Sequence, residues 1–211
     1  LIIETAIDLD QLTFTKKNLN LEPFLLNAKN EIKLENHKIK INYKKDQLTI
    51  DGQGDIFLTD NIEKLSYNIV KDNDQFLFNT KLNIKNNSLV IEFLDYEKKK
   101  GDDSIILING DLKKNGSIEF KLISLQENNN KILINNLELS PTFKIKNLVS
   151  ASINYKNNND ILNKFNLKKN DSNFILKGDS FNAVKIINNI VKNDTENSSI
   201  FQNLNTKIDI R

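Results

Sequence analysis

Alternation of apolar and polar residues recurs along most of this 211-residue chain and constrains its fold more than any other feature. The stretch HKIKINY is typical, because Ile39, Ile41 and Tyr43 share one parity and polar residues fill the positions between them. Successive side chains of a β-strand point to opposite faces of the sheet. Roughly a dozen such segments, spaced by about 10–15 residues and joined by short polar turns, predict an antiparallel β meander.

Most of these strands would have one polar face in water and one apolar face that something must cover. A second sheet would make a closed sandwich, closure would make a barrel, and a strongly curved open sheet would leave an apolar trough. Alternation by itself favours the sandwich. An open trough exposes more contiguous apolar surface than soluble monomers usually tolerate, so it would imply an apolar ligand or partner.

Three stretches depart from simple alternation. SIILINGDL, residues 104–112, is almost uniformly apolar, which predicts a strand covered on both faces. Gly52 and Gly54 interrupt one strand and indicate a bulge or a close approach of neighbouring strands. Pro23 and Pro141 are expected near strand starts or edges, where a missing N–H is tolerated.

The stretch FILKGDSFNAVKIINNIV, residues 174–191, changes period and predicts a short helix over 179–192. Gly178 would end the preceding strand, and Asp179 or Ser180 would cap the first helical turn. A helix this short needs tertiary packing, so its apolar stripe would lie on the sheet. The stripe consists of Val184, Ile187 and Val191.

The domain organisation expected from these patterns is simple. Residues 1–178 form a repetitive β-sheet region, the helix packs on it, and 193–211 form a linker and the start of the next strand. The chain has no Met and begins and ends in strand-like sequence, so we expect a fragment whose edge strands pair with adjacent β segments of a longer chain. It contains no apolar run of about 18 residues, the length that predicts a membrane-spanning helix.

Composition excludes several classes of function. The absence of Cys excludes disulfides and thiolate metal sites. The 30 basic and 28 acidic residues are interspersed, whereas a nucleic-acid surface needs clustered Lys and Arg, so no nucleic-acid partner is expected. The single histidine, His37, is expected to be a solvated residue at a strand edge, and the pairs Asp72/Asp74 and Asp102/Asp103 to be charged loops. No catalytic constellation is visible, so we expect neither an enzyme nor a cofactor or metal.

Two quoted stretches resemble a known family. IEFKLISLQENNNKILINNLELSPTFKIKNL, followed by ILKGDSFNAVKIINNIV, is similar to the central region of YhdP-type members of the AsmA-like family of Gram-negative envelope proteins. In that family, amphipathic strands are punctuated by a Gly, a small polar pair, an aromatic, an Asp-Ala-like pair and a short helix. Residues 178–183 match this order, except that Asn182 stands where the family has Asp.

The resemblance implies a periplasmic β-groove, tethered to the inner membrane by a helix outside this chain. Such a groove shelters acyl chains while phospholipids move between the inner and outer membranes. The candidate groove-lining residues are Ile39, Ile41, Leu48, Ile50, Phe76, Phe78, Leu89, Ile91, Ile118, Phe120, Ile132 and Ile134. The alternative is a structural or adhesive β domain, a spacer or recognition module, in which the same residues form an ordinary core.

Overall fold

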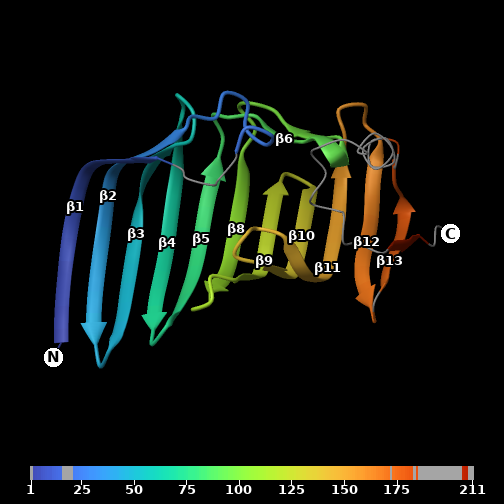
Figure 1. Ribbon diagram of the computed structural model, residues 1–211. Helices are drawn as coiled ribbons and strands as arrows, with labels where there is room; N and C mark the ends of the chain where they lie inside the picture. The colour runs from blue at the N-terminus through green and yellow to red at the C-terminus, as the bar shows by residue number, and fades with distance from the viewer. Residues whose placement is uncertain (1, 16–20, 172, 183, 185–205, 209–211) are drawn as a thin grey trace.

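A computed structural model of the chain describes residues 2–15, 21–171, 173–182, 184 and 206–208. Twelve strands form one open sheet in which each strand lies beside its neighbours in the chain (Figure 1). All neighbouring pairs are antiparallel except β13 and β14, which are parallel. The strands are β1 (Ile2–Thr15), β2 (Glu31–Lys44), β3 (Gln47–Phe57), β4 (Ile62–Asp72), β5 (Gln75–Ile84), β8 (Ser104–Leu112), β9 (Ile118–Glu127), β10 (Asn130–Leu139), β11 (Ile145–Lys156), β12 (Leu162–Asn170), β13 (Asn173–Ser180) and β14 (Thr206–Ile208).

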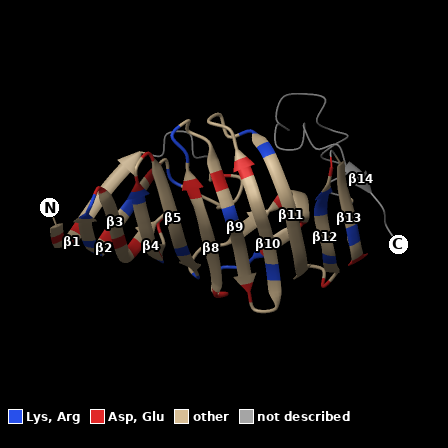
Figure 2. Ribbon diagram, turned by 90° about the horizontal axis from the view of Figure 1, so that it is seen from below, with Lys and Arg blue, Asp and Glu red and all other residues tan. Residues whose placement is uncertain are grey.

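The predicted antiparallel meander is therefore confirmed, and the sheet is open. The closed sandwich is wrong for the described residues, because no second large sheet packs on the first. The sheet twists along its length, so that β1–β4 and β8–β11 run in different directions when viewed from below (Figure 2). A twist of this kind is the ordinary consequence of backbone sterics in strands of L-residues.

One insertion interrupts the meander between β5 and β8. It contains β6 (Leu89–Ile91), the 3₁₀ turn η1 (Glu92–Leu94) and β7 (Tyr96–Lys98), and β6 and β7 pair only with each other. The alternating residues of LVIEF predict a strand of the main sheet, and this is wrong: they lie in the inserted segment. Together with residues 21–28, this insertion lies over one end of the apolar face (Figure 1).

The buried core lies where these two segments meet the sheet. Two sets of apolar side chains form it. One set comes from the strands where they lie beneath the insertion, and the other comes from residues 21–28 and from the insertion itself. The core consists of Leu25, Ile32, Leu34, Ile56, Leu58, Leu89, Leu94, Tyr96, Leu125, Ile132, Ile153, Tyr155, Phe165 and Leu176.

Asparagine and aspartate have a conformational role in this fold. Of the eleven described non-glycine residues with positive φ, nine are Asn or Asp. Their short polar side chains make the left-handed region less costly than it is for other residues. Asn36 and Asn136 take this conformation within strands, and Asn73 and Asp171 take it in turns between strands. Part of the Asn-rich composition therefore supports turns and strand irregularities.

The uniformly apolar strand β8 is not covered on both faces. Ile105 and Leu107 are 38% and 36% exposed on the face opposite the core. The prediction from SIILINGDL is wrong because no element lies over this face of β8 among the described residues.

The predicted helix falls mostly outside the described residues, including Ile187 and Val191. Strand β13 continues to Ser180, two residues beyond the predicted boundary at Gly178. Asp179 pairs with Lys164, and the Ser180 hydroxyl donates to the carbonyl of Leu162 at 2.5 Å. Among the described residues, neither Asp179 nor Ser180 accepts a hydrogen bond from a helical N–H. The Asn182 side chain instead accepts a hydrogen bond from the N–H of Val184 at 3.2 Å.

Candidate functional site

The apolar face of the sheet is the candidate site. Cross-strand pairing places ten of the twelve predicted lining residues on this face, since directly paired residues project to the same side. The other two, Leu89 and Ile91, lie on β6 and pack against the core from above. The ten are Ile39, Ile41, Leu48, Ile50, Phe76, Phe78, Ile118, Phe120, Ile132 and Ile134. Whether they contact a ligand stays a prediction.

The face has two zones. At the covered end, Ile132 and its neighbour Leu125 are each only 6% exposed. Towards the other end of the strands, side chains on this face remain partly accessible, and Phe76 on β5 is 37% exposed. We call the part beneath residues 21–28 and 85–103 the covered end, and the remainder the open end.

A single cross-strand row shows how continuous the open end is. It crosses nine strands from β1 to β11, and all but Thr5 and Gly110 carry apolar side chains. Phe78 and Phe120 meet edge to face over Gly110, with ring centroids 6.0 Å apart. The row consists of Thr5, Ile41, Ile50, Ile69, Phe78, Gly110, Phe120, Leu137 and Leu148.

Two glycines on this face, Gly52 and Gly110, sit beneath rings from the adjacent strand, and Gly178 lies against the Cβ of Phe165. Gly52 lies opposite Tyr67, and a Cβ added there would come 2.2 Å from the ring. Gly110 lies opposite Phe78, and Gly178 opposite Phe165. Gly52 therefore makes room for a side chain of the next strand, and the predicted bulge is present opposite Gly54, in the register shift between Glu35 and Lys38. A ring that lies over its neighbour in this way shields sheet surface that no side chain covers.

His37 belongs to the same pattern, and its predicted solvent exposure is wrong. Its side chain is fully buried on the apolar face above Gly54 and stacks on Tyr67, with ring centroids 6.0 Å apart. His37 Nε2 lies 2.9 Å from the carbonyl oxygen of Asp55. Burial also raises the pKa of the Tyr67 phenol.

Buried polar groups hold the insertion to the covered end. The Glu63 carboxylate, only 2% exposed, accepts hydrogen bonds from the backbone N–H groups of Lys85 and Asn86, both at 2.8 Å, and from Asn87 Nδ2 at 2.7 Å. Lys98 is fully buried and donates to the carbonyl oxygens of Lys85 and Asn87 at 3.0 and 2.7 Å. Burial lowers the pKa of its ammonium group, although nearby carboxylates oppose the shift.

Two tyrosines complete this attachment. The Tyr96 hydroxyl donates to Glu127 on β9 at 2.7 Å, and the Tyr155 hydroxyl on β11 donates to the carbonyl of Leu94. The two rings meet edge to face at 5.3 Å. Burial raises the pKa of both phenols, and the Glu127 carboxylate adds to the shift at Tyr96. The insertion is thus tied to the far strands of the sheet.

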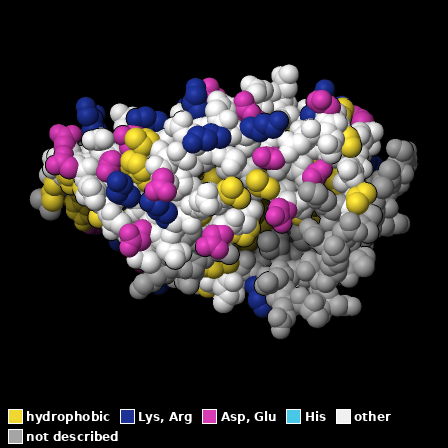
Figure 3. All heavy atoms as spheres, turned by 90° about the horizontal axis from the view of Figure 1, so that it is seen from above, with side chains coloured by type: hydrophobic (Ala, Val, Ile, Leu, Met, Phe, Trp, Pro, Cys, Tyr) yellow, Lys and Arg dark blue, Asp and Glu magenta, His cyan; other side chains and the backbone are white. Residues whose placement is uncertain are grey.

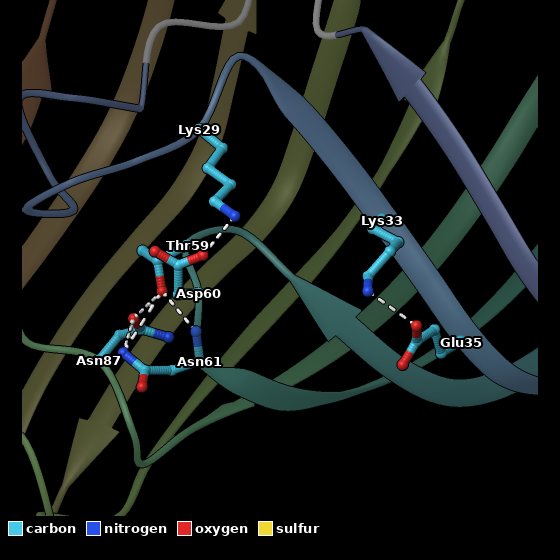
Figure 4. Close-up of polar contacts among 7 residues, drawn as sticks. All are labelled: Lys29, Lys33, Glu35, Thr59, Asp60, Asn61 and Asn87. Carbon is cyan, nitrogen blue, oxygen red and sulfur yellow. Dashed lines mark hydrogen bonds and ion pairs between the residues drawn. The ribbon is translucent and has the colours of Figure 1, made fainter.

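The connection between β1 and β2 is fixed at the rim of the covered end (Figure 4). Lys29 pairs with Asp60, and its N–H donates to the carbonyl of Leu58 at 2.9 Å. Beside it, the Thr59 hydroxyl donates to Asn87 Oδ1 at 2.5 Å. Viewed from this end, charged and other polar side chains surround small groups of hydrophobic atoms (Figure 3).

The acidic side chains of the described residues do not gather into a metal-binding group. Within these residues, no group of three or more His, Cys, Asp and Glu side chains could hold a metal ion. Asp74 and Asp103 instead form surface ion pairs with Lys114 and Lys85, at 2.7 and 3.3 Å.

Several residues of the apolar face are absent from the predicted lining set. Ile69, Leu112 and Leu137 each have a predicted lining residue as a direct cross-strand partner. Parity within the strand places Ile69 and Leu112 correctly. It fails for Leu137, which shares a face with Ile134 only because β10 is irregular at Asn136. What the sequence lacks is the cross-strand register, which brings residues far apart in the chain into one row.

Comparison with protein-family models, curated proteins and solved structures finds no match to this chain. The resemblance to the AsmA-like family therefore stays a prediction. Among the described residues, no helix has the length and apolar character required to cross a membrane.

Proposed function

We propose that the open end of the apolar face binds phospholipid acyl chains. The observation that carries the proposal is one continuous apolar face that the described residues cover at only one end. Partly exposed Ile, Leu and Phe side chains at the open end would otherwise face water. Contiguous apolar surface of this kind usually marks a binding site.

Hydrocarbon matches the chemistry of the open end. The row from Thr5 to Leu148 contains no charged side chain and only one hydroxyl. Nine strands at about 4.8 Å spacing extend roughly 38 Å. The hydrocarbon of one membrane leaflet is roughly 15 Å thick, half of the bilayer core. A row of this length would accommodate acyl chains of ordinary size.

Binding would depend on buried area rather than on head-group recognition. Each methylene removed from water contributes about 0.8 kcal/mol. The row itself offers a polar head group no ion pair, and the exposed Lys71, between Leu48 and Phe76 on the same face, would meet only the phosphate that all phospholipids share. We therefore expect lipids with different head groups to bind with similar affinity.

The biological role that we propose follows the family resemblance in residues 118–148 and 175–191. The chain would be a periplasmic segment of an AsmA-like protein, tethered to the inner membrane by an anchor outside these residues. Its role would be to shelter acyl chains during phospholipid transport between the two membranes in envelope biogenesis.

Mass spectrometry of organic extracts tests acyl-chain binding. The chain is expressed in a Gram-negative periplasm, purified gently and extracted beside the double variant Phe78→Asp/Phe120→Asp. We expect phospholipid to accompany the original chain and to be lost from the variant, because two carboxylates would interrupt the apolar row. Circular dichroism checks that the variant is folded.

The opposite face supplies a matched control. Ile105→Asp/Leu107→Asp introduces the same two charges at exposed apolar positions outside the apolar row. This variant should retain its lipid. The proposal would be contradicted if both double variants lost phospholipid equally, or if the original chain purified without phospholipid.

The second candidate is a structural or adhesive β domain that carries no lipid. The well-packed covered end favours it, since that core can stabilise the fold without a ligand. Lipid-free protein that unfolds cooperatively would support this function instead.

A further inference from the structure

Strand β1 forms one edge of the sheet and pairs with β2 over thirteen residue positions. In an antiparallel pair, roughly half of the backbone N–H and C=O groups of an edge strand point away from the partner. β1 therefore offers a long row of hydrogen-bonding groups on its outer edge.

The side chains of β1 give this edge a defined chemistry. Ile3, Ile7, Leu12 and Phe14 extend the apolar face and are 42–47% exposed. Glu4 and Asp8 lie on the opposite, polar face, as their cross-strand partners Asn42 and Lys38 show. The strand contains no Lys, Arg or Pro, residues that commonly protect sheet edges from further pairing.

Charge alternates from strand to strand beside this edge. Among the charged side chains of the polar face, β1 carries only acidic ones, β2 carries four lysines and two glutamates, and β3 carries only acidic ones. Lys38 lies opposite Asp8, and Lys40 lies opposite Asp51. Bands of opposite charge are visible on these strands in Figure 2. Continuing the alternation outward places a basic strand beside β1.

We propose that the outer edge of β1, with which no described strand pairs, binds an antiparallel polypeptide strand that alternates apolar and basic residues. Its apolar residues would extend the row begun by Ile3 and Ile7, and its basic residues would face Glu4 and Asp8. A second copy pairing through its own β1 fits poorly, since carboxylates would then lie opposite carboxylates, which is destabilising. The proposal does not depend on acyl-chain binding.

A synthetic peptide with the sequence of residues 31–44, EIKLENHKIKINYK, is a suitable probe. The same sequence already pairs with the inner edge of β1 and has the required alternation. The control peptide has its four lysines replaced by glutamate. Fluorescence anisotropy with the labelled peptides should show binding of the lysine peptide, and about tenfold weaker binding of the glutamate peptide, because favourable cross-strand charge pairs become repulsive.

Charge reversal in the protein completes the test. The variant Glu4→Lys/Asp8→Lys changes two exposed side chains and should reverse the preference, so that the glutamate peptide binds more tightly. Retained lipid in this variant would separate edge pairing from acyl-chain binding.

Three results would overturn the proposal: no binding of either peptide, equal binding of both, or an unchanged preference in the charge-reversed variant. Self-association of the original chain that neither peptide affects would assign the edge to a second copy instead. Sedimentation velocity over a range of protein concentrations measures this outcome.

Discussion

The covered and open ends of the apolar face are built from the same strands by the same alternation of residues. On β9, Leu125 is buried beneath the insertion, whereas Phe120, five residues earlier, remains partly exposed. On β10, Ile132 and Ile134 differ in the same way. The strands themselves do not determine which part of the face is buried and which part stays exposed. Burial is determined by the length and position of the segments that lie above the strands.

Truncation of matched phenylalanines should show the largest difference between the two ends. Phe165→Ala removes a buried ring that packs against Phe181 and should destabilise the fold by about 3–5 kcal/mol. Phe76→Ala removes a ring that is already more than one-third exposed, so we expect a loss of about 1 kcal/mol. Urea unfolding measures both. Equal losses would show that the open end is as well packed as the covered end.

Removal of the Glu63 carboxylate should loosen the covered end by a smaller amount. Glu63→Ala leaves the N–H groups of Lys85 and Asn86 without their buried acceptor, which should cost about 1–3 kcal/mol. Limited proteolysis should then cut more rapidly within residues 85–103. Asp74→Ala removes a carboxylate from an exposed ion pair and is the control, expected to cost less than about 1 kcal/mol. Similar proteolysis of both variants would refute the role of Glu63.

The smallest expected effect is a pH dependence at Lys98. Its pKa lies below the ordinary 10.5 because burial disfavours the charged ammonium. Between the lowered pKa and 10.5, the unfolded chain binds more protons than the folded one, so the contribution of Lys98 to stability rises with pH. Below that range both states are protonated and the burial penalty is fully present.

Comparison with Lys98→Met isolates this contribution. The free energy of unfolding of the original chain, relative to the variant, should increase as pH rises from neutral towards 10.5. Other titrating groups are common to both proteins and cancel in the difference. A difference that stays constant across this range would show that Lys98 does not titrate differently in the folded state.

Local sequence was sufficient to predict most strands and their faces. Period-two alternation identifies a strand and separates its two faces without knowledge of its neighbours, which is why Ile39, Ile41 and Ile50 were placed correctly. The sequence also indicated that His37 lies on the apolar face, since it is two residues from Ile39 in the same strand. Its polarity misled the prediction, because the space above Gly54 that receives the ring becomes visible only when β2 and β3 are paired.

The division between covered and open ends could not be predicted in the same way. Leu89 and Ile91 alternate like residues of the main sheet, yet they belong to a small hairpin above it. The contacts that hold this hairpin join residues far apart in the chain, such as Tyr155 and Leu94, 61 positions apart. No local pattern specifies contacts at such separations. The same limit applies to the exposed Ile105 and Leu107, whose apolar character does not show what lies above them.

The meander connectivity bears on how such a sheet can change size. Each strand from β1 to β5 and from β8 to β13 pairs only with its neighbours in this sheet, so no connection crosses another. One added hairpin would widen the sheet by two strand spacings, about 10 Å, and leave every existing pairing in place. As in repeat proteins, stability would then accumulate through nearest-neighbour interfaces. Gain or loss of whole hairpins could adjust the reach of the apolar row without a new fold.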